Sequence, residues 1–251
     1  MIGFFTSSPS GPLDNSRKVL GLDPMNHFVD NLKKYWRGTA RVLMITAFPE
    51  DDAANDQMVD FFAGAIEDAE LPMETFDLWD HREERKSLNR LLSYDVILFG
   101  GGHVPTQNRF FKSFGLRNKM HIYRTKRHDG MVIGISAGTM NSADHVYAQP
   151  ELDGEAADPQ YKRFIRGLGL TKTNILPHYQ MVKDSILDQQ RLFEDITYKD
   201  SMGKRFLALP DGSYLLSVHG KETVWGEAYE IKDGVLRQIS RENEVVRWNQ
   251  E

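Results

Sequence analysis

The sequence predicts an α/β fold with a doubly wound, mainly parallel sheet and antiparallel strands near the C-terminus. Apolar, strand-like runs alternate with amphipathic, helix-like segments through the first two-thirds of the chain, and the pattern changes after about residue 205. Strands separated by helices form parallel βαβ units, because parallel strands need a long crossover connection. With 251 residues and no evident linker or internal repeat, the chain suits a single domain, residues 1–251.

The elements of the parallel part are expected in strict alternation. Ile2–Thr6 is a short apolar strand, and Asn26–Trp36 carries apolar residues at helical spacing. Val42–Phe48 is a nearly continuous apolar run, typical of a strand covered on both faces. The remaining helices and strands of this part are expected at Asp51–Ala69 (helix), Glu74–Leu78 (strand), Glu83–Leu92 (helix), Asp95–Phe99 (strand), Gln107–Phe114 (helix) and Met131–Ile135 (strand).

The last fifth of the chain alternates apolar and polar residues and contains turn signals. Phe206–Val218 and Glu222–Ile231 show this alternation, and Asp-Gly or His-Gly pairs at residues 211–212, 219–220 and 233–234 mark turns. We interpret this tail as antiparallel strands that complete the domain.

Composition excludes several classes of protein. A net charge of −5 argues against a dedicated nucleic-acid binder, and the basic run Arg117–Arg127 has few aromatic residues, so we interpret it as a solvated face. No apolar run approaches the roughly 20 residues that cross a bilayer, so no membrane partner is expected. The chain contains no cysteine, which excludes disulfides, thiolate metal sites and a cysteine nucleophile. A cytoplasmic location is the expectation.

The sharpest candidate site is Gly134-Ile135-Ser136-Ala137-Gly138, a Gly-x-Ser-x-Gly run at the end of a predicted strand. Such a run lets a serine occupy a tight strand-to-helix turn, where larger residues at the glycine positions would clash. The turn exposes the hydroxyl group and directs backbone N–H groups toward developing negative charge. The sequence therefore predicts Ser136 as a nucleophile. The alternative is a structural turn that packs a helix against a strand.

A serine nucleophile needs a base, and the chain has eight histidines. His178 follows the apolar run Asn174–Pro177, where the carboxyl end of a strand would deliver it to the site. His145 falls at the end of the helix after Ser136, from which it would point away. His178 is therefore the preferred base.

The base in turn needs a carboxylate that holds its tautomer. The segment between the serine and the histidine contains an acidic loop, and its residue pattern leaves the choice of acid open. Most acids in such a loop are solvated. The candidates are Glu151, Asp153, Glu155 and Asp158.

Gly100-Gly101-Gly102-His103 follows another predicted strand but lacks the spacing of a dinucleotide-binding or phosphate-binding loop. The glycines permit close backbone approach, and their N–H groups could complete an oxyanion hole. His103 is placed to line the same pocket. No histidine pair has metal-ligand spacing, so neither a metal nor another cofactor is expected.

Four short motifs follow one another in the chain: Phe99-Gly-Gly-Gly-His103, Gly134-Ile-Ser-Ala-Gly138, Leu176-Pro-His-Tyr179 and Leu209-Pro-Asp-Gly212. Their combination and order resemble the peptidase E and cyanophycinase family of serine peptidases. The resemblance spans about Arg41 to Gly226. It implies the class I glutamine amidotransferase-like, flavodoxin-like fold, and it leaves residues 1–40 as an N-terminal extension without a functional interpretation.

The resemblance also implies roles for individual residues. Ser136 would be the nucleophile and His178 the base, with oxyanion donors from Gly101 or Gly102 and from the N–H group of Ala137. The third member would be an acid between the serine and the histidine. By its spacing from the serine, Glu151 matches that position best.

One stretch departs from the pattern of the family's aspartyl dipeptidases. Those enzymes carry a Thr-Arg-x-x-Arg run after the catalytic histidine, whose first arginine can meet the aspartate of the substrate. The matching stretch here is Leu187–Arg191, with Asp188 at that arginine. A preference for aspartyl dipeptides is therefore not carried over.

Three functional hypotheses follow. The first is a serine peptidase acting on small peptides, with a homodimer left open. The second is an α/β-hydrolase esterase, although its histidine would usually lie much further from Ser136 than His178 does. The third is a non-catalytic binding module on the same fold. Glutamine amidotransferases use a cysteine nucleophile, which this chain lacks.

Overall fold

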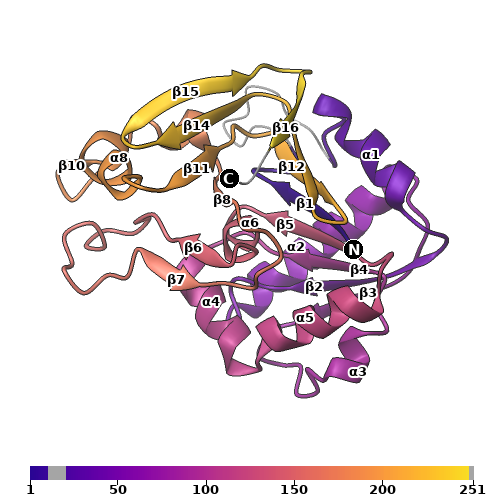
Figure 1. Cartoon of the computed structure of the whole chain (residues 1–251). Helices are drawn as coiled ribbons and strands as arrows, with labels where there is room; N and C mark the ends of the chain where they lie inside the picture. Colours follow the sequence, from indigo (N-terminus) through magenta and orange to yellow (C-terminus); the bar gives the residue numbers. More distant parts are fainter. Residues whose placement is uncertain (11–20, 249–251) are drawn as a thin grey trace.

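The computed structural model describes residues 1–10 and 21–248, and an eight-stranded sheet forms its centre (Figure 1). The strands of this sheet are β1 (Ile2–Thr6), β2 (Ala40–Ile45), β3 (Met73–Trp79), β4 (Val96–Phe99), β5 (Met131–Ile135), β12 (Tyr214–Val218), β13 (Lys221–Trp225) and β16 (Val245–Trp248). Their order is β16-β13-β12-β1-β5-β4-β2-β3. The five strands from β1 to β3 in this order run parallel, whereas β12, β13 and β16 are antiparallel additions.

Helices cover both faces of the parallel part, as a doubly wound sheet requires. They are α1 (Phe28–Tyr35), α2 (Asp52–Asp68), α3 (Leu88–Leu91), α4 (Val104–Ser113) and α5 (Leu116–Lys126). Helices α1 and α2 bury Phe28, Leu32 and Phe62 against one face of the sheet. Helices α3, α4 and α5 cover the other face.

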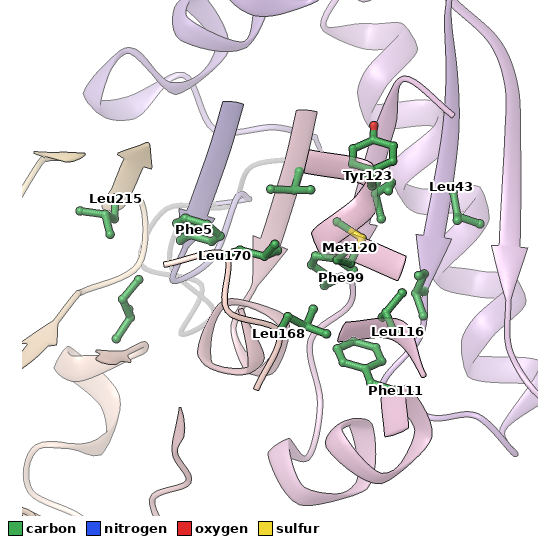
Figure 2. Close-up of a cluster of buried hydrophobic side chains, with 14 of the residues drawn as sticks. Phe5, Leu43, Phe99, Phe111, Leu116, Met120, Tyr123, Leu168, Leu170 and Leu215 are labelled. Atoms are coloured by element: carbon green, nitrogen blue, oxygen red, sulfur yellow. The ribbon is translucent and has the colours of Figure 1, made fainter. Parts of the chain in front are cut away.

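Successive residues of each parallel strand point into opposite halves of the core, which explains the continuous apolar runs in the sequence. In β2, Leu43 belongs to one buried cluster and Val42 to the other. Figure 2 shows the first cluster, in which Phe99 lies near Phe111 of α4 and Met120 of α5. The core therefore fixes the sheet between two layers of helices.

A second, four-stranded sheet is formed by strands that all follow β5 in the chain. It has the order β15-β14-β11-β8, with β8 (Asn174–Leu176) parallel to β11 (Arg205–Ala208), and with β14 (Ala228–Lys232) and β15 (Val235–Ser240) antiparallel. The remaining short elements are η1 (Met25–His27), α6 (Ala137–Asn141), β6 (His145–Tyr147), β7 (Phe164–Arg166), α7 (Tyr179–Val182), β9 (Ile186–Leu187), β10 (Gln190–Arg191), η2 (Leu192–Thr197) and α8 (Tyr198–Asp200).

The fold class predicted from the sequence is confirmed, including the mainly parallel sheet and the antiparallel strands near the C-terminus. One interpretation was wrong: the basic run Arg117–Arg127 is not only a solvated face. It forms α5, whose residues Leu116, Met120 and Tyr123 are fully buried. The C-terminal strands divide between the two sheets.

The N-terminal segment is more than an extension of the domain. Strand β1 lies between β5 and β12 in the middle of the large sheet. Its side chains Phe4 and Phe5 are fully buried. Residues 11–20 of the predicted extension 1–40 lie outside the described residues. Within the described ranges, no helix is both long enough and apolar enough to cross a membrane.

Candidate active site

Ser136 occupies a tight turn between β5 and α6. Its backbone has φ 49° and ψ −110°, a conformation that costs free energy for any residue with a side chain and that recurs at functional sites. A Cβ atom at Gly138 would lie 2.2 Å from the carbonyl oxygen of Phe99, and one at Gly134 would lie 2.8 Å from Thr139. Glycine at these two positions therefore lets α6 approach the sheet closely enough to form the turn.

His178 lies at the carboxyl end of β8, directly before α7. Its φ of 57° is left-handed, and this conformation turns the chain sharply from the strand into the helix. The imidazole Nε2 atom lies 2.8 Å from the hydroxyl oxygen of Ser136. The structure thus brings together the two residues that the sequence placed after two different strands.

Asp211 completes a chain of hydrogen bonds through the imidazole. Its Oδ1 atom lies 2.6 Å from Nδ1 of His178, and its side chain is fully buried. Because a carboxylate can only accept, Nδ1 carries the proton and Nε2 is left to accept from Ser136. Gln180 donates from Nε2 to Oδ2 of Asp211 over 2.7 Å and accepts from its backbone N–H group.

The environment keeps Asp211 ionised. Burial by itself would raise the pKa of this carboxyl group, but the hydrogen bond and the charge of His178 counteract it. Further hydrogen bonds from Ser7 and Gln180 add to this effect, and the resulting pKa of Asp211 lies below its usual value. A negative charge is therefore fixed beside the imidazole, where it stabilises the imidazolium form.

The carboxylate beside His178 is Asp211 and not Glu151, so the structure differs from the expectation here. Glu151 is exposed, and none of the four acids in its loop contacts His178 in the part of the chain that the structure describes. Glu155 instead lies 2.8 Å from His103, and Asp158 accepts the N–H group of Gln160. The side chains of the acidic loop thus make other contacts. The carboxylate that binds the imidazole of His178 comes from a later segment of the chain.

A signal for Asp211 was present in the sequence. Strands β8 and β11 run parallel, with Ala208 opposite Leu176, so the residues after them emerge at the same edge. His178 and Asp211 follow these strands after similar short steps, each preceded by a proline. The Asp211-Gly212 pair is, however, also typical of a turn, and this second meaning masks the carboxylate in the sequence.

His103 uses both ring nitrogens within the protein. Nε2 pairs with Glu155, and Nδ1 lies 2.8 Å from the hydroxyl oxygen of Thr106 in the first turn of α4. Neither ring nitrogen of His103 is therefore free to bind a substrate, the role predicted for this residue. The contact does fasten the acidic loop beside the glycine loop.

The glycine loop follows β4 and lies against Ser136. A Cβ atom built on Gly101 would lie 3.5 Å from Cβ of Ser136, in ordinary contact. Gly102 has a φ of 147° and approaches the ring of Phe48 so closely that only glycine fits. Among the described residues, the backbone N–H groups of Gly101, Gly102 and Ala137 donate no hydrogen bond. Two of the predicted oxyanion donors, Gly101 and Ala137, thus lie beside Ser136.

In the described ranges, no group of three or more histidine, aspartate or glutamate side chains could hold a metal ion. The fold and site define an α/β protein with a serine, a histidine and a carboxylate linked in series at the carboxyl edge of its sheets.

The comparisons with known proteins agree with this class. The model of peptidase family S51 matches residues 24–224, which is most of the chain. The chain therefore belongs to peptidase family S51 and is a serine peptidase, and the resemblance found in the sequence is confirmed. No curated protein matches the chain significantly.

Solved structures show the same fold. A crystal structure of a peptidase from an acI-B1 Actinobacterium is 15% identical, with a TM-score of 0.66, over 98% of this chain and 96% of that chain. A putative peptidase E from Listeria monocytogenes EGD-e is 18% identical, with a TM-score of 0.52, over 95% of this chain and 98% of that chain. At these identities the likeness concerns the fold.

Proposed function

We propose that the chain hydrolyses small peptides through a triad of Ser136, His178 and Asp211. The observation that carries this proposal is the unbroken series of hydrogen bonds, 2.8 Å from Ser136 to His178 and 2.6 Å from His178 to Asp211. Ser136 lies on a strained strand-to-helix turn, the backbone of a nucleophile elbow. This geometry is suited to nucleophilic attack by a serine that transfers its proton to a histidine.

In the first step, the hydroxyl oxygen of Ser136 attacks the carbonyl carbon of the scissile bond while Nε2 of His178 takes the hydroxyl proton. The carbonyl oxygen becomes negative, and the N–H groups of Ala137 and of Gly101 or Gly102 are the donors that would bind it. Asp211 stabilises the imidazolium ion without taking its proton.

His178 then gives its proton to the departing amine, and the carbon–nitrogen bond breaks to leave an acyl ester on Ser136. A water molecule enters, loses a proton to Nε2 of His178 and attacks the ester. The second tetrahedral intermediate collapses to release the carboxylic acid, and the proton returns to the oxygen of Ser136. The enzyme is regenerated with atoms and charge in balance.

The contacts of the acidic loop support small peptides as substrates. Glu155 binds His103, which directly follows the glycine loop, so the loop is fastened next to the proposed oxyanion donors. Asp188 holds the loop on its other side by accepting the backbone N–H groups of Gly154, Ala156 and Ala157. A loop fastened at both sides leaves less room for a folded protein than for a short peptide.

The same contacts argue against a preference for aspartyl dipeptides. Asp188 stands where the family's aspartyl dipeptidases have an arginine, and its carboxylate is committed to three backbone N–H groups. An acid at that place would repel an acidic substrate side chain. We expect neutral or basic residues at that subsite.

Labelling with a fluorophosphonate probe tests the triad without knowledge of the substrate. We expect the wild type to be labelled on Ser136, and we expect Ser136→Ala to remain unlabelled. Ser142→Ala is the matched control, because Ser142 is a buried serine at the end of the same helix, α6. Equal labelling of the wild type and Ser136→Ala would refute the proposal. A peptide library graded by length would then test whether turnover falls as peptides lengthen.

A further inference from the structure

The last residue of β1 and the residue that follows it together contact all three members of the proposed triad. The carbonyl oxygen of Thr6 accepts the backbone N–H group of Ser136 over 3.2 Å and the hydroxyl group of Thr139 over 2.8 Å. The hydroxyl group of Thr6 in turn donates to the carbonyl oxygen of Gly134 over 2.8 Å. Thr6 therefore fixes the turn that carries the serine.

Ser7, the next residue, fixes the other two members. Its hydroxyl oxygen accepts the backbone N–H group of His178 over 2.7 Å, and its hydroxyl group donates to Oδ1 of Asp211 over 2.7 Å. Ser7 is fully buried, and its own N–H group donates to the carbonyl oxygen of Ser213 over 3.2 Å. The Ser7 hydroxyl is thus a bridge between the base and the acid.

We propose that Ser7 is a positioning residue that sets the imidazole of His178 against Asp211. This inference rests on the proposed triad and adds a residue to it. Ser7 lies outside residues 24–224, the part of the chain that matches the family.

The bridge needs a group that donates and accepts at once, and a hydroxyl group does both. Oδ1 of Asp211 receives the Ser7 hydroxyl group and Nδ1–H of His178, so the two donors together determine how the carboxylate is rotated. Removing the hydroxyl leaves the partly buried N–H group of His178 without this acceptor. The carboxylate then loses one of the two donors on Oδ1, and the imidazole loses its alignment with Ser136.

The experiment measures the second-order rate of fluorophosphonate labelling of the full chain and its Ser7→Ala variant. We expect Ser7→Ala to label roughly tenfold more slowly, the effect of losing one hydrogen bond to a charged group. Ser7→Thr keeps a hydroxyl group and should restore most of the rate. Ser8→Ala is the matched control: Ser8 is a buried neighbour, and its carbonyl oxygen, which the variant keeps, accepts from Gly212.

A spectroscopic measurement separates positioning from a general loss of structure. The proton between Nδ1 of His178 and Asp211 should give a strongly downfield proton NMR signal, and we expect this signal to shift or broaden in Ser7→Ala and to persist in Ser8→Ala. Slower labelling with an unchanged signal and a lowered unfolding temperature would assign Ser7 a structural role only and overturn the inference.

The outcomes distinguish this inference from the proposed function. Equal labelling of the wild type and Ser136→Ala overturns the triad and the role of Ser7 with it. Specific labelling of Ser136 at a rate that Ser7→Ala leaves within twofold supports the triad but overturns the role of Ser7. Slower labelling of Ser7→Ala, a changed signal and rescue by Ser7→Thr support both.

Discussion

Two partly buried histidine–carboxylate pairs lie in the described part of the chain, and of these two only one faces a serine. In the first pair, His178 binds Asp211 through Nδ1 and reaches Ser136 through Nε2. In the second pair, His103 binds Glu155 through Nε2 and Thr106 through Nδ1. Both imidazoles thus lie between a carboxylate and a hydroxyl group, at distances between 2.6 and 2.8 Å.

The hydroxyl partner decides what each pair can do. Thr106 lies in the first turn of α4, and its hydroxyl oxygen also accepts from Arg109 over 3.0 Å. Ser136 lies on a strained turn beside unoccupied N–H groups that could bind an oxyanion. A carboxylate–histidine–hydroxyl series is therefore not sufficient for a nucleophile, because the position of the hydroxyl group and the donors around it must also fit.

The largest difference between the pairs should appear when each carboxylate is made neutral. We expect Asp211→Asn to slow labelling of Ser136 and peptide turnover by about 10⁴-fold, because an asparagine favours the wrong imidazole tautomer. Glu155→Gln should slow them less than about tenfold, because this pair only fastens a loop. Circular dichroism of both variants checks that they fold. A similar decrease of the labelling rate and of peptide turnover in both variants would mean that both pairs take part in catalysis.

The stability of the protein should depend on pH through Asp211. Its pKa in the folded chain is lowered, mainly by His178 against the opposing effect of burial, whereas the unfolded value is near 3.8. Stability from this group is therefore present above about pH 4 and is lost as the pH falls through the lowered pKa. We expect the free energy of unfolding, measured by urea titration, to fall more steeply below about pH 4 in the wild type than in Asp211→Asn.

Parallel curves for these two proteins would contradict the pKa shift. Glu155→Gln provides a comparison in which the carboxylate of the other pair is removed and Asp211 remains. Its curve should keep the steep fall of the wild type at low pH.

The smallest effect concerns the loop that the second pair helps to fasten. Asp188→Ala removes an acceptor shared by three backbone N–H groups, at a net cost of about 1 kcal/mol in the free energy of unfolding. We expect faster proteolytic cleavage within residues 152–158 and a labelling rate within about twofold of the wild type. The exposed residue Asp184 offers a matched control, Asp184→Ala. Cleavage at equal rates in the two variants would show that Asp188 does not hold the loop.

The sequence predicted the parallel sheet because buried strands leave continuous apolar runs that are hard to mistake. It also predicted the proximity of Ser136 and His178, since each follows an apolar strand and parallel strands end at one edge. The buried face of α5 was not predicted, although Leu116, Met120 and Tyr123 recur at helical spacing. The arginine and lysine residues between them made the whole run look solvated.

Asp211 could not be chosen from local pattern alone. Its contact with His178 depends on the pairing of β8 with β11, and strands of three and four residues leave little periodicity to recognise. An Asp-Gly pair is also the usual sequence of a tight turn. Ser7 was missed for a related reason, because its importance arises from a contact with a residue 204 positions away.

That separation has a consequence for the order in which the protein becomes active. Ser136 is synthesised well before Asp211, and Ser7 must wait through 204 residues for its carboxylate partner. Contacts between such distant segments form late in folding, since they close the longest loops. A growing chain on the ribosome would carry the serine without its acid. Peptidase activity would then appear only after the strands that carry His178 and Asp211 have folded. Incomplete chains would therefore not hydrolyse peptides.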